Sequence, residues 1–236
     1  KYKTNLKHTA YSNLAKCYEK LENLNLADLY YKKAIEDAIN KYGVNNIYTA
    51  GIYLSYAVFL SQQQNEIDAF NYFRMTTEIY HSNFGEKHPY LSDAYNNLGE
   101  HYRRNEQRDS ALHYFQKSLI AISPGFNNMK IASNPELSEV LSKTHFLRAL
   151  KNKALALQQK ASKRNNIELY QISLATFDVA KEVTRAIRSG YLNDESKLFL
   201  ADNEDETFSN ALQTSFTLYQ LTKQEIYLEK AFHYSE

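Results

Sequence analysis

The stretch 95–124, YNNLGEHYRRNEQRDSALHYFQKSLIAISP, decides the fold. Its apolar and aromatic residues recur every three or four positions on both sides of a polar break at 105–106, as they do in two successive amphipathic helices. Ala111 has counterparts in Ala69 and Ala27, each 42 residues earlier. A pattern that returns at a fixed step predicts a repeat protein built from stacked helical hairpins.

Neighbouring positions repeat at the same step and keep their size. The matched sets are Tyr11, Tyr53 and Tyr95; Leu14, Tyr56 and Leu98; Ala15, Ala57 and Gly99; Tyr30, Tyr72 and Tyr114; and Tyr31, Phe73 and Phe115. We expect the small residues to lie where helices cross, because a larger side chain there would push the backbones apart. The aromatic residues should fill the space between hairpins.

This order of aromatic, apolar, small and alanine positions resembles the tetratricopeptide repeat, a helix-turn-helix unit usually of 34 residues. The longer step of 42 residues, with the segment FGEKHP at 84–89, is similar to the long-helix repeats of kinesin light chains and many bacterial multi-repeat proteins. The resemblance covers residues 1 to about 130. It implies an all-α fold, an α-solenoid of about five tetratricopeptide-type antiparallel hairpins that forms a right-handed superhelix.

The chain is expected to be one tetratricopeptide-repeat domain over 1–236, with three regular hairpins followed by two irregular ones. The regular hairpins are placed at 3–42, 47–83 and 89–122, and the irregular ones at 135–189 and 194–236. After a loop at 126–134, helical periodicity from Pro135 predicts a long helix through Leu137, Val140 and Leu141. Its partner, which starts after residue 166, repeats the small, aromatic, small spacing at Ser173, Phe177 and Ala180.

The last hairpin is expected to begin with an irregular segment at 193–201 and a helix from about Asp205 to Leu221. A second helix follows from 224, with Tyr227, Ala231 and Ser235 in the second-helix positions of the repeat. Because a repeat array needs a polar terminal cap, and this sequence reads as helical at both ends, we expect a fragment of a longer protein.

Composition narrows the function classes. Lys and Arg number 28 against 27 Asp and Glu, so no global field favours nucleic acid or an anionic membrane surface. No apolar run approaches the roughly 18 residues of a membrane span. The single cysteine, Cys17, excludes an internal disulfide and fits a cytoplasmic location.

The sequence carries no pattern for catalysis, a cofactor or a metal, and we expect no enzyme activity. The seven histidines form no metal-ligand motif, and the six glycines form no phosphate-binding loop. Cys17 adjoins the packing residue Tyr18 and is expected to be a buried or half-buried thiol rather than a nucleophile. The acidic run 202–206 lacks calcium-loop spacing and is interpreted as a solvated helix start.

A protein or peptide ligand is the expected partner, held in the concave groove formed by the first helix of each hairpin. The candidate groove residues are the polar ones beside the packing positions: Asn13, Lys16, Ser55, Asp93, Asn97, Glu100, Arg103 and Arg104. Asparagine is informative at Asn13 and Asn97, because an amide can both donate to and accept from an extended peptide backbone. An exposed polar residue without a ligand is the alternative interpretation.

The second half carries a further resemblance, in the segments 170–178, 185–191, 195–201 and 227–236. These are similar to the tetratricopeptide arm of bacterial CHAT-domain proteins, in which the arm precedes a caspase-like peptidase domain. The resemblance implies a non-catalytic scaffold that regulates an appended C-terminal CHAT domain. The alternative is a peptide-sensing module of a bacterial signalling or transcription regulator.

Overall fold

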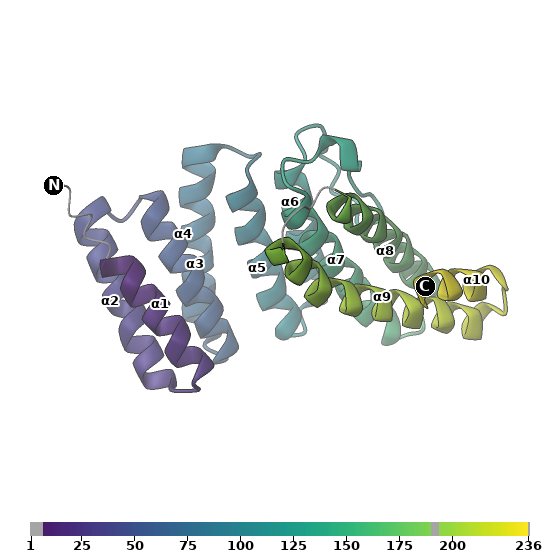
Figure 1. The fold of residues 1–236 in the computed structure, drawn as a ribbon, viewed down its shortest axis with the longest axis horizontal. Coiled ribbons are helices and arrows are strands. Elements are labelled where there is room, and N and C mark those ends of the chain that lie inside the picture. The colour runs from purple at the N-terminus through teal and green to yellow at the C-terminus, as the bar shows by residue number, and fades with distance from the viewer. Residues whose placement is uncertain (1–6, 190–193, 236) are drawn as a thin grey trace. The chain divides into compact units, whose positions relative to one another are not determined.

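The computed structural model describes residues 7–189 and 194–235, with side chains described in 7–189 and 205–235. Every regular element in these ranges is a helix (Figure 1). The bounds are α1 Lys7–Lys20, α2 Leu24–Tyr42, α3 Ile47–Gln62, α4 Glu66–Phe84, α5 Pro89–Arg104, α6 Arg108–Ile122, the 3-10 helix η1 Leu137–Glu139, α7 Lys143–Ser162, α8 Ile167–Arg188, α9 Asp194–Thr222 and α10 Ile226–Ser235. The all-α fold is therefore confirmed.

Consecutive α-helices pair into five hairpins, which we number 1 to 5 from α1/α2 to α9/α10. The chain divides into two compact units, Lys1–Glu86 and Lys87–Glu236. The first holds hairpins 1 and 2, and the second holds hairpins 3 to 5. The helices of the three regular hairpins lie where the sequence predicts them, to within a few residues; the expected start of α1 at residue 3 lies outside the described residues.

An asparagine begins the second helix of most hairpins. The side chains of Asn23, Asn65 and Asn166 each accept a hydrogen bond from the backbone N–H three residues later, at 3.3, 3.4 and 3.0 Å. Such caps satisfy one of the four amides that a helix leaves unpaired at its N-terminus. In hairpin 3 the equivalent residue, 42 positions after Asn65, is Gln107, and its side chain makes no cap bond.

The repeated small residues lie where helices cross, as predicted. Ala27, Ala69 and Ala111 are all fully buried. At Gly99 the space is tighter still, because a Cβ atom there would stand 2.7 Å from the ring of Phe115 in the same hairpin. Small residues are therefore needed at these positions because the helix backbones approach each other closely.

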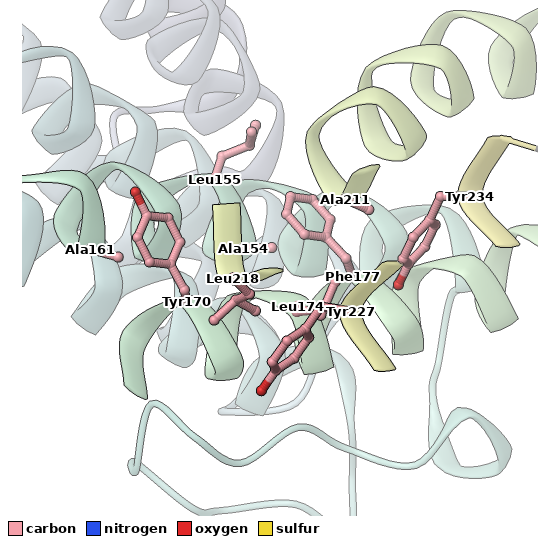
Figure 2. Close-up of a cluster of buried hydrophobic side chains, with 10 residues drawn as sticks. All are labelled: Ala154, Leu155, Ala161, Tyr170, Leu174, Phe177, Ala211, Leu218, Tyr227 and Tyr234. Carbon is pink, nitrogen blue, oxygen red and sulfur yellow. The ribbon is translucent and has the colours of Figure 1, made fainter. Parts of the chain in front are cut away.

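Aromatic residues fill the space between hairpins within each unit. In the first unit the Tyr31 ring of hairpin 1 lies 5.6 Å from Tyr56 and 5.3 Å from Phe59 of hairpin 2, measured between centroids. In the second unit Figure 2 shows Phe177 of α8 between small residues of α7 and α9, Ala154 and Ala211. The predicted alternation of small and aromatic residues therefore continues where the 42-residue step is lost.

The long helix expected from Pro135 begins eight residues later, at Lys143. Leu137 lies in the short η1, and Leu137 and Val140 pack half-buried against the core cluster of α6, α7 and α8. Leu141 donates its N–H to the carbonyl of Ile122 at 2.9 Å. The apolar spacing at 137–141 thus comes from a loop that packs on the core and not from a helix.

The last hairpin also differs from expectation. The segment 194–201, expected to be irregular, is the beginning of α9, while Asn193 lies outside the described residues. In α10 the buried residues are Tyr227 and Tyr234, whereas Ala231 is half-buried and Ser235 is exposed. Residues seven apart share a helix face, so Tyr234 takes the inward position expected for Ser235.

Cys17 is exposed, which corrects the expectation of a buried or half-buried thiol. Its repeat equivalent Phe59 is buried, because it packs against Tyr31 of the hairpin before it. No hairpin precedes α1 among the described residues, so the same position in α1 faces solvent.

The loop 123–136 is held by side-chain donors from outside the loop. Lys87, in the connection before α5, donates from Nζ to the carbonyls of Ser123 at 3.2 Å and Phe126 at 2.7 Å. The buried Lys153 of α7 donates from Nζ to the Ser133 carbonyl and the Asn134 Oδ1, both at 2.8 Å. These bonds explain how a long loop lies against the core with its carbonyls satisfied.

Candidate binding surface

In the second unit the first helices α5, α7 and α9 follow one another in contact. Between α5 and α7, Asp93 forms an ion pair with Arg148, and Asn152 donates to Asn96 Oδ1 at 3.2 Å. Side-chain bonds of this kind tie neighbouring first helices together.

Between α7 and α9 there are polar contacts of the same kind. Lys151 Nζ lies 2.9 Å from Glu206 Oε2, and Gln158 donates from Nε2 to Thr214 Oγ1 at 3.0 Å. We call the side chains of α5, α7 and α9 that take part in these contacts, together with Asn97, the polar wall. Most of its members are held by a partner on the next helix.

Of the predicted groove residues in this unit, most are engaged within the protein. Glu100 accepts a bidentate pair of bonds from Arg103, at 2.8 Å to Nε and 2.5 Å to an Nη atom. Arg104 Nε lies 3.6 Å from Glu100. The Glu100 hydrogen bond raises the pKa of Arg103, and so does the charge of Glu206 on α9. The end of α5 is therefore charge-compensated.

Asn97 stands one turn after Asp93 on the same face of α5. Its Nδ2 donates to the Asp93 carbonyl at 2.8 Å, and the side chain is half-buried. An amide has two N–H groups and one carbonyl oxygen, so one donor and the acceptor remain. Asn97 can therefore pair with a peptide backbone without breaking a contact of the fold.

The other predicted groove residues belong to the first unit. Asn13 and Lys16 on α1 are exposed. Ser55 on α3 is half-buried and donates its hydroxyl to the Gly51 carbonyl at 3.2 Å. The helices α1 and α3 contact one another, so these three residues stand on adjacent first helices.

Sequence reasoning missed the residues that α7 and α9 contribute to the polar wall, which are Arg148, Lys151, Asn152, Gln158, Glu206 and Thr214. The groove residues were found by stepping 42 residues along the chain, and that step fails after Pro135. The helical periodicity of 143–162 gives the face of α7 but not its register against α5. No signal in the sequence identifies these partners.

One contact joins a serine to a histidine, the residue types that serve as nucleophile and general base in hydrolases. Ser142 Oγ lies 2.8 Å from His145 Nδ1 at the start of α7. Burial lowers the pKa of His145, and the nearby Asp93 opposes that effect. The Asp93 carboxylate is paired with Arg148, so no acid orients the imidazole as a triad requires. The pair is a local contact at a helix start.

Two pairs of tyrosines stack inside their own hairpins. The ring centroids of Tyr18 and Tyr30 lie 5.4 Å apart, and those of Tyr102 and Tyr114 lie 5.3 Å apart. The ring planes are nearly parallel in both pairs. His88 is the N-cap of α5, and its Nδ1 accepts from the Tyr90 N–H at 3.1 Å. These rings and this imidazole therefore have structural partners.

Two open clefts lie in the second unit, apart from the polar wall. One, of about 1210 Å³, is bounded by α8, α9 and α10. One of its carboxylates, Asp178, is already bound by Lys230 at 2.5 Å and by the Tyr234 hydroxyl. The other, of about 570 Å³, lies between the turns of hairpins 3 and 4.

Within the described part of the chain, no three His, Cys, Asp or Glu side chains are grouped so as to hold a metal ion. In the same residues, no helix has the length and apolar character needed to cross a bilayer.

A tetratricopeptide-repeat family model matches residues 48–119. No curated protein matches the sequence.

Several solved structures match at fold level, including the following two. BtubC (BKLC) from P. vanneervenii matches with a TM-score of 0.60 and 19% identity, over 79% of this chain and 66% of that one, so this chain spans just under two thirds of its length. A Podosopora anserina protein with nearly identical TPR-like repeats, described as a kinesin light chain, matches with a TM-score of 0.61 and 13% identity, over 96% and 94% of the two chains. The chain has the fold of a tetratricopeptide-repeat solenoid with kinesin-light-chain-like repeats.

Proposed function

We propose that this chain is a non-catalytic, cytoplasmic scaffold that binds a protein or peptide segment along its first helices. The polar wall of α5, α7 and α9 carries the proposal, because it is a pre-formed polar surface held by bonds between the helices. A surface that is already ordered pays little entropy when a ligand binds.

Asn97 is the residue proposed to recognise the ligand backbone. Its amide keeps one donor and its acceptor after the bond to the Asp93 carbonyl. An extended peptide presents one N–H and one C=O on the same edge, and a fixed amide can pair with both. Asn13, the repeat equivalent on α1, is exposed and would do the same in the first unit.

The charges on the wall favour a peptide of mixed charge. Arg148 and Glu206 are both substantially exposed, and their partners Asp93 and Lys151 are the less exposed members of each pair. Cationic and anionic groups therefore alternate between helices. Such a surface gives no net attraction to a polyanion, which supports a protein ligand over nucleic acid.

The test is a peptide selected from a random display library on the whole chain, labelled and titrated by fluorescence anisotropy. Asn97→Ala should weaken its binding about fivefold, which corresponds to about 1 kcal/mol for one hydrogen bond. Asn83→Ala is the matched control, because Asn83 on the second helix α4 makes the same bond to a carbonyl four residues earlier, at 2.8 Å.

Equal affinity losses in the two variants would contradict the proposal, and so would no loss in either. Asn13→Ala is the second variant, and we expect a similar loss if the ligand also contacts the first unit. Thermal unfolding of all three variants separates lost binding from lost folding.

We further propose that the chain is the regulatory arm of a CHAT-type protein. The similarity of 170–178, 185–191, 195–201 and 227–236 to such arms supports this. A ligand that prefers one shape of the array would shift the population of shapes and so the state of the peptidase domain.

The sequence that follows in the gene is the direct test of this arm. A caspase-like domain with a His and Cys pair supports it, and a stop codon or an unrelated domain contradicts it. An upstream helix-turn-helix or a downstream kinase signature would point to the peptide-sensing regulator instead.

A further inference from the structure

The smaller cleft lies where two turns meet at one edge of the second unit. The turn at 105–107 leads into α6, and the turn at 163–166 leads into α8. The cleft between them measures about 570 Å³ and is lined by residues of both. Leu169 of α8 lies in it and also packs against the core cluster of α6 and α7, which gives the cleft a firm apolar base.

Positive charge gathers around this cleft although the chain as a whole is nearly neutral. Four cationic side chains line it, Arg108, Lys160, Lys163 and Arg164, against two carboxylates, Glu106 and Asp109. The two carboxylate side chains are 72% and 85% exposed, whereas that of Arg108 is only 17% exposed. The acids therefore stand at the rim, and a cation lies deep in the cleft.

The ion pairs that Glu106 makes are loose, whereas Asp109 and Lys160 form a close, hydrogen-bonded pair at the rim. Glu106 lies 3.5 Å from Arg108 and 3.7 Å from Lys163, both beyond normal hydrogen-bond length. Arg164 is exposed and forms no ion pair within the described residues. Pairs between such exposed groups contribute little, so a ligand anion can replace them at low cost.

Two donors in the cleft lack the partners that the rest of the fold supplies. The Nε atom of Arg108 is buried and has no hydrogen-bond partner. Gln107 replaces the cap asparagine of the other hairpins, so Ser110 N–H receives no side-chain cap. The backbone does not explain the missing cap, because Gln107 has φ −83° and ψ 68°, nearly the values of Asn65, −84° and 77°.

We propose that this turn cleft binds an oxyanion carried by a protein segment, with a phosphorylated side chain fitting best. A phosphate has three free oxygens and about two negative charges, so it can meet Lys163 and Arg164 together with the uncapped start of α6. The site shares no residue with the polar wall, and it is independent of peptide binding there.

The test uses three labelled Gly-Ser peptides that differ only at the centre: phosphoserine, three glutamates, or serine. Anisotropy titrations at low and high salt measure binding to the whole chain. We expect the phosphoserine peptide to bind most tightly, the glutamate peptide more weakly and the serine peptide not at all, with affinity falling as salt rises.

The variant K163Q/R164Q should weaken binding of the phosphoserine peptide about fivefold. The control K32Q/R74Q should change its affinity less than twofold. Lys32 and Arg74 suit the control because both are exposed and each pairs with a carboxylate on its own helix. If the glutamate peptide binds best, the oxyanion is a carboxylate. Equal losses in the two double variants, or tighter binding of a short RNA than of either acidic peptide, would overturn the proposal.

Gln107→Asn supplies a second measurement that a merely surface-charge effect would not reproduce. Restoring the repeat cap should raise the melting temperature by a few degrees, as helix caps do. It should at the same time weaken binding of the phosphoserine peptide about threefold, because the new side chain accepts the hydrogen bond from the Ser110 N–H that the anion would otherwise accept. A variant that is more stable and binds as tightly as before contradicts the role of the uncapped helix.

Discussion

Lys153 gives the sharpest prediction for stability. Its side chain is fully buried in α7, and its Nζ donates to the Ser133 carbonyl and the Asn134 Oδ1 of the long loop. Burial lowers the pKa of Lys153 from 10.5 to about 7. No charged side chain accounts for this change, so the cost of desolvating an ammonium group dominates.

The sign of the pH dependence follows from proton binding. Between pH 7 and 10.5 the unfolded chain keeps the Lys153 proton and the folded chain releases it, so the free energy of unfolding rises with pH. Each pH unit is worth about 1.4 kcal/mol, which gives about 3 kcal/mol from pH 7 to 9.5. The range stops there because burial also raises the pKa values of Tyr31, Tyr56 and Tyr234, and such phenols reduce stability once the unfolded chain ionises near pH 10.

The assay is urea unfolding followed by circular dichroism at several pH values, for the wild type and Lys153→Met. The difference between the two free energies should change by about 3 kcal/mol across this range, with the variant relatively most stable at low pH. Lys130→Met is the matched control, since Lys130 is an exposed lysine of the same loop, and it should run parallel to the wild type. Parallel curves for Lys153→Met would refute the reasoning.

Three further predictions concern packing and exposure. Gly99→Ala should lower the free energy of unfolding by about 1 kcal/mol, because its Cβ would stand 2.7 Å from the ring of the buried Phe115 and the clash outweighs the gain in helix propensity. Gly51→Ala should instead raise it by up to about 1 kcal/mol, since its Cβ would meet only a tyrosine hydroxyl at 3.6 Å; urea unfolding of both variants checks the contrast, and equal signs would contradict it. Ala69→Leu should destabilise by about 1 to 3 kcal/mol through overpacking, and an unchanged unfolding midpoint would show that the site is not close-packed. Cys17 should react fully with a thiol reagent in the native protein, and protection until denaturant is added would show that it is buried.

The regular hairpins could be predicted because their decisive contacts recur at a fixed step. Ala27, Ala69 and Ala111 are buried at the same position of three successive hairpins. Once one of them is assigned, the 42-residue step gives the helices of the other hairpins. The failures lie where the step is lost. Leu137 and Val140 have helical spacing but pack from a loop, and sequence periodicity cannot distinguish these two cases over so few residues.

The candidate site was only partly predictable for a related reason. Asn97 could be found because it repeats Asn13 two steps later, whereas Arg148 becomes a wall residue only through the register of α7 against α5. The turn cleft was hidden because balanced overall charge conceals local clusters. Its cations come from turns more than 50 residues apart, around Arg108 and Lys163, and only the folded chain brings them together.

The central claim is that the first helices bind a protein segment, and hydrogen exchange with the display-selected peptide tests it most directly. Bound peptide should slow exchange in α5, α7 and α9, which form the polar wall in the second unit. Exchange in the second helices α6 and α8 should change little. Protection confined to α6 and α8, or absent from α5, α7 and α9 at saturating peptide, would contradict the claim.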